Sequence, residues 1–279
     1  MRVFLTGATG YVGGAVAMGL RGRGHEVAAL VRPESDAKLL RERGVFIIAG
    51  DLSSLPNLSS TLAEYDAVVH TAFSPKDAVA QDRIAVETLA AQKGCFVFTS
   101  GVWVLGAGNS SESSKLNPLP LVAWRPAHEN LALATGRGAV LRPGCVYGGK
   151  QSLLAGWFAA ADQRGPLQVA GDGNNHWAMI NVHDLADCVV RVIEQKATGI
   201  FHAVDDTRAT LNECARAVAP SGKIDHVPAE GPFGQALTVD QTVSSDATRQ
   251  KLGWMPTRTF VSSIDEQWRE WRASLRPDD

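Results

Sequence analysis

Short apolar runs alternate with longer amphipathic stretches along most of this 279-residue chain. The runs are rich in Val, Ala, Leu and Phe, which is typical of buried strands in a parallel sheet, and the stretches between them have the length and spacing of helices. Strands are predicted at residues 2–5, 25–31, 45–49, 66–70, 95–99, 139–142 and 199–204. Helices are predicted at residues 11–20, 35–43, 58–64, 77–92, 124–135, 153–161, 211–218 and 260–271. This alternation predicts an α/β fold with a doubly wound parallel sheet, whose ligand lies at the carboxyl ends of the strands.

The pattern changes after Gln151, where turn-rich segments replace the regular alternation. Residues 151–279 are therefore predicted to form a smaller substrate-binding lobe, some elements of which return to the sheet. Asp184 is expected to be a helix N-cap, because it stands at the start of an apolar-periodic stretch. Residues 228–237 are rich in Gly and Pro and are predicted to be a flexible lid.

The first predicted strand is followed at once by a turn with glycines at positions 7, 10 and 13, and then by a helix. Strand, glycine turn and helix together are the context in which dinucleotides bind, because the helix N-terminus attracts phosphate. The glycines allow the tight turn, the approach of the pyrophosphate and close packing of helix on strand. A glycine-rich surface turn is the alternative. Residues 1–150 are thus predicted to be a dinucleotide-binding domain of Rossmann type, with cofactor contacts from Thr6, Gly7, Thr9, Gly10, Tyr11, Val12 and Gly13.

Arg32 ends the second predicted strand and indicates which dinucleotide binds. An acid at this position binds the ribose hydroxyls of NAD, whereas a basic residue accommodates the 2′-phosphate of NADP. A guanidinium suits a phosphate in charge and shape. We therefore expect NADP rather than NAD, although Glu34 lies nearby and Arg32 could simply be a solvated arginine.

Composition limits the kinds of partner that the chain is expected to bind. The net charge is −2 and no basic stripe is present, so the sequence predicts no nucleic-acid partner. No apolar run is long enough to span a membrane. The four cysteines are scattered without a C-x-x-C pair, which argues against a zinc or other metal site and against a disulfide framework, and favours a cytoplasmic location. A small-molecule substrate is the expected partner, and the chain is expected to be a monomer or a homodimer.

The segment TGATGYVG resembles the signature of the short-chain dehydrogenase/reductase superfamily, in its extended and atypical branches. The resemblance implies that Asp51 and Leu52, after the third strand, lie beside the adenine, although Asp51 could equally be a turn residue. It also implies that the run His70, Thr71 and Ala72 lines the cofactor, while His70 could instead be a hydrogen-bonded core histidine. The segment Arg142–Gly148 is similar to one that borders the substrate pocket in this superfamily.

The superfamily's catalytic Tyr-x-x-x-Lys is missing, because none of the three tyrosines precedes a lysine by four positions. If Glu129 matches the glutamate that often follows the lysine, Arg125 takes the lysine's place and Leu121 the tyrosine's. Leu cannot transfer a proton, and arginine stays protonated, although Arg125 could still reach a ribose or phosphate. The remaining catalytic candidates are Tyr147, Ser100 and His176, and Ser100 is also a candidate cofactor contact. Asn175, His176 and Trp177 are candidate substrate contacts. Tyr147 could equally serve packing, and Tyr11 is a further phenol near the nicotinamide.

Three functions are compatible with these residues. The first is an NADPH-dependent oxidoreductase that acts on a small carbonyl substrate with a non-standard proton donor. The second is an epimerase or dehydratase on a nucleotide sugar, as in the extended branch, although that chemistry relies on the missing tyrosine. The third is a non-catalytic protein that senses NADP(H), which the loss of Tyr and Lys would allow.

Overall fold

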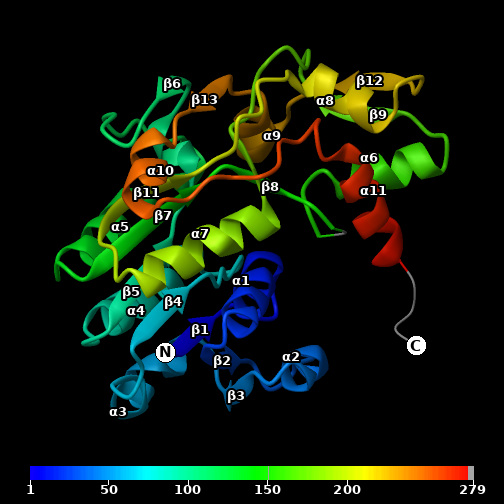
Figure 1. Ribbon diagram of the computed structural model, residues 1–279. Helices are drawn as coiled ribbons and strands as arrows, with labels where there is room; N and C mark the ends of the chain where they lie inside the picture. The colour runs from blue at the N-terminus through cyan, green and yellow to red at the C-terminus, as the bar shows by residue number, and fades with distance from the viewer. Residues whose placement is uncertain (150, 276–279) are drawn as a thin grey trace.

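A seven-stranded parallel sheet forms the centre of the molecule, in the computed structural model that describes residues 1–149 and 151–275 (Figure 1). The strand order is β11-β7-β5-β4-β1-β2-β3. The strands are β1 (Arg2–Thr6), β2 (Glu26–Val31), β3 (Phe46–Ala49), β4 (Ala67–His70), β5 (Cys95–Thr99), β7 (Gly138–Pro143) and β11 (Gly199–Ala203). Each lies within one residue of its predicted bounds. The predicted α/β fold with a doubly wound sheet is therefore confirmed.

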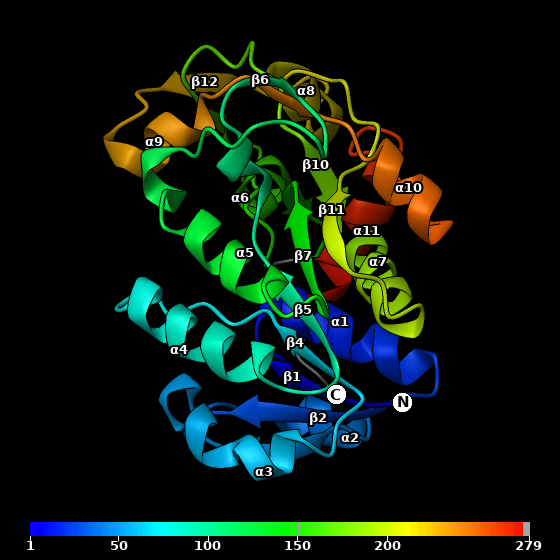
Figure 2. The ribbon, with the colours of Figure 1, turned by 90° about the vertical axis from the view of Figure 1, so that its left-hand side faces the viewer.

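Helices cover both faces of this sheet (Figure 2). One face carries α1 (Tyr11–Gly22), α2 (Lys38–Glu42) and α7 (Val182–Glu194), and the other carries α3 (Ser59–Leu62), α4 (Ala78–Ala90) and α5 (Arg125–Leu133). Side chains alternate between the faces along each strand. In β1, Val3 and Leu5 pack into the core beneath α1 and α7, whereas Phe4 packs into the core beneath α4 and α5. Burial on both faces explains why the strands are continuous apolar runs.

The C-terminal part of the chain contributes to the sheet and also builds a lobe over one end of it (Figure 1). Strand β11 and helix α7 belong to the sheet and its cover, as expected. The lobe has its own aromatic-rich core, which includes Trp157, Phe158 and Trp271. The lobe contains α6 (Ala155–Asp162), β9 (Leu167–Ala170), α8 (Leu211–Val218), β12 (Ile224–Val227), α9 (Gly231–Leu237) and α11 (Ile264–Ala273). The predicted division into residues 1–150 and 151–279 stays a prediction, and residues 150 and 276–279 lie outside the described residues.

Shorter elements make up the rest of the described secondary structure. They are the paired strands β6 (Gly108–Ser110) with β13 (Gln241–Val243) and β8 (Cys145–Tyr147) with β10 (Met179–Asn181), the helix α10 (Asp246–Leu252), and 3-10 turns at Leu52–Leu58, Val102–Leu105 and Pro120–Val122. No helix in the described part of the chain is both long enough and apolar enough to cross a lipid bilayer.

The prediction that Asp184 caps α7 is wrong. The cap is Asn181, whose side-chain oxygen accepts a hydrogen bond from the backbone N–H of His183 at 2.9 Å. Asp184 lies inside the first turn and is buried, and its carboxylate accepts hydrogen bonds from Thr257 and Arg258. Asp184 therefore ties α7 to the segment before α11, which no local pattern could indicate.

A buried ion pair holds α5 against the sheet. The Arg142 guanidinium in β7 donates two hydrogen bonds to the Glu129 carboxylate in α5, at 3.1 Å from Nε to Oε1 and 2.5 Å from Nη2 to Oε2. Both side chains are 2% exposed. A buried pair of this kind is costly to break, because the remaining charge has neither water nor a partner. The pair therefore fixes the position of α5 and of Arg125 at its first turn.

We predict that Glu129→Ala lowers the free energy of unfolding by about 3–5 kcal/mol, since it leaves Arg142 buried and unpaired. The matched control is Glu87→Ala, which breaks the exposed Arg83–Glu87 pair within α4 and should change stability by less than about 1 kcal/mol. Urea denaturation of both variants measures the difference. Equal effects of the two substitutions would contradict this assignment.

Candidate functional site

The glycine turn after β1 is packed too closely for side chains at two of its three glycines. Gly7 has φ +83°, and a Cβ there would lie 2.6 Å from the backbone nitrogen of Ala72. A Cβ on Gly13 would lie 2.1 Å from the carbonyl oxygen of Gly7. Gly10 is the N-cap of α1 and has no side chain that could cap the helix. The N-terminus of α1 therefore offers its first N–H groups to a ligand, as an anion site requires.

A cavity of 650 Å³ surrounds this turn at the carboxyl ends of β1, β2 and β4. Most of the predicted cofactor residues line it, namely Thr6, Gly7, Thr9, Gly10, Tyr11, Val12, Gly13, Arg32, Asp51, Leu52, Thr71 and Ala72. His70, Ser100 and Arg125 were also predicted to bind the cofactor, but they do not line this cavity. Residues from four separate stretches of the chain thus meet at the expected edge of the sheet.

Arg32 lies at the mouth of this cavity, where β2 ends. Its side chain is 66% exposed, and its Nε is 3.4 Å from Oε1 of Glu34, which is 68% exposed. An ion pair that is this exposed is weak, so the guanidinium can turn toward a ligand at little cost.

Asp51 performs the turn role that was its alternative interpretation. It caps the 3-10 turn Leu52–Leu58, where its Oδ1 accepts hydrogen bonds from the hydroxyl of Ser53 at 2.6 Å and the backbone N–H of Ser54 at 3.1 Å. These hydrogen bonds, led by that of Ser53, lower the pKa of Asp51. Asp51 is therefore an ionised cap that also faces the cavity.

His70 is buried in a hydrogen-bonded network beneath the cavity. Its Nδ1 is 2.7 Å from the Thr6 hydroxyl, and its Nε2 is 3.2 Å from Oδ1 of Asp82 in α4. The other oxygen of Asp82 is 2.6 Å from Nδ1 of His128 in α5. Burial by itself would raise the pKa of Asp82, but hydrogen bonds from His70 and His128 hold it below its usual value. His70 is therefore a hydrogen-bonded core histidine, and its contact with the Thr6 hydroxyl helps to position Thr6 at the cavity.

A second cavity, of 700 Å³, adjoins the first, and Tyr11, Val12, Phe73 and Pro75 line both. The second cavity is lined by Ser100, a predicted catalytic candidate, and by Leu121 and Arg125, which were expected at the positions of the superfamily's tyrosine and lysine. Ser100 is 7% exposed, and its hydroxyl is buried without a hydrogen-bond partner. A buried hydroxyl is normally paired, so an unpaired one at a cavity wall indicates a place for a ligand's polar atom.

Arg125 is held in place by its surroundings. Its Nη1 donates a hydrogen bond to the Thr99 carbonyl oxygen at 3.1 Å, and its guanidinium carbon lies 4.7 Å from the centre of the Trp124 ring. Burial lowers the pKa of Arg125, while the nearby charges of Asp82 and Glu129 oppose this shift. Arginine stays protonated under these conditions, so Arg125 supplies a fixed positive charge beside Ser100.

Two catalytic candidates lie away from both cavities. Tyr147 is fully buried in the lobe core, where its hydroxyl donates a hydrogen bond to Oδ2 of Asp205 at 2.8 Å and its ring packs edge-on against Phe260. His176 is half-buried, and its Nδ1 is 2.9 Å from Oδ1 of Asp240. Neither residue lines the cavities around the glycine turn or Ser100. The geometry supports a structural role for Tyr147, its alternative interpretation, and gives no support to proton transfer by either residue.

Tyr11 does line both cavities, but its hydroxyl is engaged. It donates a hydrogen bond to the carbonyl oxygen of Gly148 at 2.6 Å, and burial raises the pKa of the phenol. Tyr11 therefore contributes to the walls of both cavities and ties α1 to the segment that follows β8.

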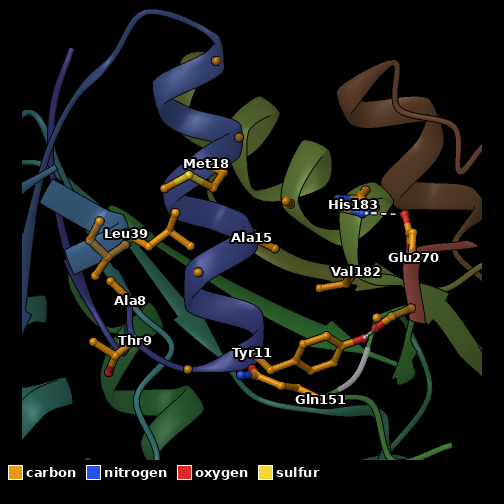
Figure 3. Close-up of a pocket in the computed structure, with 18 of the residues that line it drawn as sticks. Ala8, Thr9, Tyr11, Ala15, Met18, Leu39, Gln151, Val182, His183 and Glu270 are labelled. Atoms are coloured by element: carbon orange, nitrogen blue, oxygen red, sulfur yellow. Dashed lines mark hydrogen bonds and ion pairs between the residues drawn. The ribbon is translucent and has the colours of Figure 1, made fainter. Parts of the chain in front are cut away.

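A third cavity, of 1050 Å³, runs along α1 between α2, α7 and α11 (Figure 3). Apolar side chains such as Met18, Ala15 and Leu39 line one side, and the His183–Glu270 pair, with Nε2 3.1 Å from Oε1, closes the other. This cavity is larger than the other two, and the side chains of His183 and Glu270 in its wall already hydrogen-bond to each other.

The walls of the second cavity include residues that the sequence did not indicate. Trp103, Trp124 and Phe233 come from three distant segments, and α9, which carries Phe233, is a short helix where a flexible lid was predicted. Trp177, a predicted substrate contact, also lines the cavity. The only local signal for Trp124 was its position next to Arg125.

Comparisons with known proteins agree with this fold. The family model described as RmlD substrate binding domain matches residues 1–277. An uncharacterized protein of Schizosaccharomyces pombe is 30% identical, with 94% of this chain and 97% of its own length aligned. A 3-diazoavenalumate denitrifying reductase of a Streptomyces species is 29% identical, over 92% and 96% of the two chains. The crystal structure of a Bacillus anthracis dTDP-glucose 4,6-dehydratase in complex with NAD superposes with a TM-score of 0.86 at 15% identity, over 99% and 97% of the chains.

Asp205, the hydrogen-bond partner of Tyr147, is expected to make the stability of the fold depend on pH. Burial raises the pKa of Asp205 to about 6. A carboxyl group whose pKa is higher in the folded than in the unfolded chain stabilises the fold while it is protonated. This stabilisation is complete below the unfolded pKa, about 3.9, and is lost as the pH rises through the folded pKa. We predict that wild-type protein loses on the order of 3 kcal/mol of stability through Asp205 over this range, and that Asp205→Asn does not.

Urea denaturation of both proteins at about pH 4.5 and about pH 7.5, between which about 2 kcal/mol of this loss should occur, measures the difference in pH dependence. All other titrating groups are common to the two proteins and cancel in the comparison. Parallel pH profiles for wild type and variant would contradict the assignment.

Proposed function

The chain belongs to the family described as RmlD substrate binding domain, and from this premise we propose that it is an NADPH-dependent oxidoreductase that acts on a small carbonyl compound. One observation carries the proposal. The cavity at the glycine turn continues into a second cavity, in which the unpaired hydroxyl of Ser100 lies beside the fixed charge of Arg125.

The first cavity fits a dinucleotide. A pyrophosphate at the uncapped N-terminus of α1 would accept hydrogen bonds from backbone N–H groups. Because Gly7 and Gly13 have no side chains, the pyrophosphate could approach the backbone closely enough to do so. Arg32 stands where it can receive a 2′-phosphate, which favours NADP. The NAD complex of the dTDP-glucose 4,6-dehydratase supports a nucleotide in this fold. The adjoining end of the dinucleotide would then lie near Tyr11 and Val12, between the two cavities.

The second cavity suits reduction of a carbonyl group. A reduced nicotinamide, when bound, supplies a hydride to the carbonyl carbon, and one proton from water completes the alcohol at the oxygen. Ser100 would donate its unused hydrogen bond to that oxygen, and Arg125 would stabilise the negative charge that develops there. Leu121 occupies the place of the usual tyrosine and cannot provide the proton. We therefore assign the final proton to solvent, relayed through the Ser100 hydroxyl.

The two other functions receive less support. An epimerase or dehydratase would need a group that both removes and returns protons at the substrate, and Leu121 cannot do so. A sensor without turnover would have side chains filling the space beside the nicotinamide, whereas a cavity of 700 Å³ is open there. The name of the Streptomyces relative, a reductase, agrees with the first function.

Arg32→Asp tests the cofactor. The substitution places a negative charge where the 2′-phosphate would bind, so we expect the affinity for NADPH to fall at least about 10-fold more than that for NADH. Calorimetric titration of both variants with both cofactors gives this ratio, and Arg43→Asp, on an arginine that does not line the cavity, is the control. An unchanged ratio of affinities would remove the argument for NADP.

Ser100→Ala tests the chemistry. Loss of a hydrogen bond to the developing oxyanion should lower kcat by about 100-fold, with little change in NADPH binding. Thr99→Val is a close control, since the Thr99 hydroxyl is also buried and unpaired but does not line the cavity. Consumption of NADPH with a panel of aldehydes and ketones measures both variants. Activity of Ser100→Ala within twofold of wild type would exclude the assigned role.

A further inference from the structure

The walls of the second cavity are aromatic on several sides. Trp103, Trp124 and Trp177 come from the turn after β5, the segment before α5 and the loop before β10, and Tyr11, Phe73 and Phe233 also line the cavity. Most of the rest of the lining is aliphatic. This inference rests on the proposed function and concerns the substrate of that same site.

These rings are held by interactions that do not involve a ligand. The Trp177 indole N–H donates a hydrogen bond to the Leu237 carbonyl oxygen at 2.9 Å, and Trp124 packs edge-on against His128 with ring centres 5.0 Å apart. The rings of Trp103 and Phe233, which lie on the turn after β5 and on α9, pack edge-to-face with their centres 6.2 Å apart. Aromatic surface that is fixed in advance can bind a flat ring with little loss of conformational freedom.

Charge in the cavity is scarce. Within the described part of the chain, Arg125 is the only charged residue among the lining side chains. Its guanidinium is engaged by the Thr99 carbonyl oxygen and Trp124, and the negative charges of Asp82 and Glu129 lie nearby. A diphosphate would bring two negative charges to walls with a single cation that is partly neutralised, and burying unpaired charge is strongly unfavourable.

We propose that the substrate is an uncharged aromatic aldehyde or ketone, and that the site does not bind nucleotide-diphosphate sugars. The ring stacks among Trp103, Trp124 and Trp177, and the carbonyl oxygen reaches the hydroxyl of Ser100. Phe233 covers the ring from α9. A volume of 700 Å³ is in the range of cavities that hold small ligands of this kind.

Ligand binding tests this proposal independently of turnover. Quenching of tryptophan fluorescence and calorimetry, on the full chain saturated with NADP⁺, compare 2-acetylnaphthalene with the aliphatic ketone 2-octanone and with UDP-glucose. We expect the aromatic ketone to bind at least about 10-fold more tightly than the aliphatic one, because only it gains ring–ring contacts, and UDP-glucose not to compete with it. Equal affinity for the two ketones, or tighter binding of UDP-glucose, would overturn the proposal.

Matched variants locate the binding. Phe233→Ala should weaken 2-acetylnaphthalene binding about 5- to 10-fold and leave NADP⁺ affinity unchanged. The ring of Phe233 is 47% exposed, so the fold should tolerate its loss, and a thermal melt checks this. The control is Phe46→Ala, which removes an exposed phenylalanine on β3 that does not line the cavity and should have no effect. Equal behaviour of the two variants would contradict the assigned position of the ring.

The outcomes also separate this inference from the proposed function. If aromatic ketones bind as expected and no carbonyl compound is reduced, the oxidoreductase proposal fails while the ligand class holds. If NADPH is consumed with UDP-linked keto sugars and not with aromatic ketones, the oxidoreductase proposal holds and the ligand class is wrong.

Discussion

Close backbone packing within the glycine turn, and between the turn and the segment after β4, is the constraint on which the site depends. Side chains are excluded at Gly7 by Ala72 of the neighbouring segment, and at Gly13 by the carbonyl oxygen of Gly7 itself. Because the backbone approaches this closely, α1 begins at the edge of the sheet, with its N-terminus open to the first cavity. Tyr11, the first residue of α1, then forms a wall of both cavities and donates a hydrogen bond to Gly148. This local packing thus positions both cavities.

Leu121 and Arg125, the residues expected at the superfamily's tyrosine and lysine positions, both line the second cavity together with Ser100. We propose that the usual proton donor is lost at this site. What remains is a hydroxyl, a fixed cation and aromatic walls, which suits hydride transfer more than chemistry that needs a strong acid or base. The buried Arg142–Glu129 pair preserves this geometry by holding α5 in place.

Features encoded locally could be predicted from the sequence. The strands, the glycine turn and the position of Arg32 depend on neighbouring residues, and the structure places them as expected, with Arg32 at the cavity. Membership of the short-chain dehydrogenase/reductase superfamily is likewise confirmed. Features that arise from distant contacts were not predictable. Asp184 pairs with residues some seventy positions later, and the partner of Tyr147 is Asp205, in the loop after β11. The aromatic walls unite segments from the sheet and the lobe, so no single stretch of sequence indicates them.

Transfer of a labelled hydride tests the central claim most directly. The protein would be incubated with a panel of aldehydes and ketones and with NADPH that carries deuterium at the transferable position of the nicotinamide, and the products would be examined by mass spectrometry and NMR. The account predicts an alcohol with one deuterium on the former carbonyl carbon, formed stereospecifically because the two cavities hold cofactor and substrate in one orientation. Tight binding of NADPH without deuterium transfer to any carbonyl compound in the panel would contradict it and would indicate a binding protein.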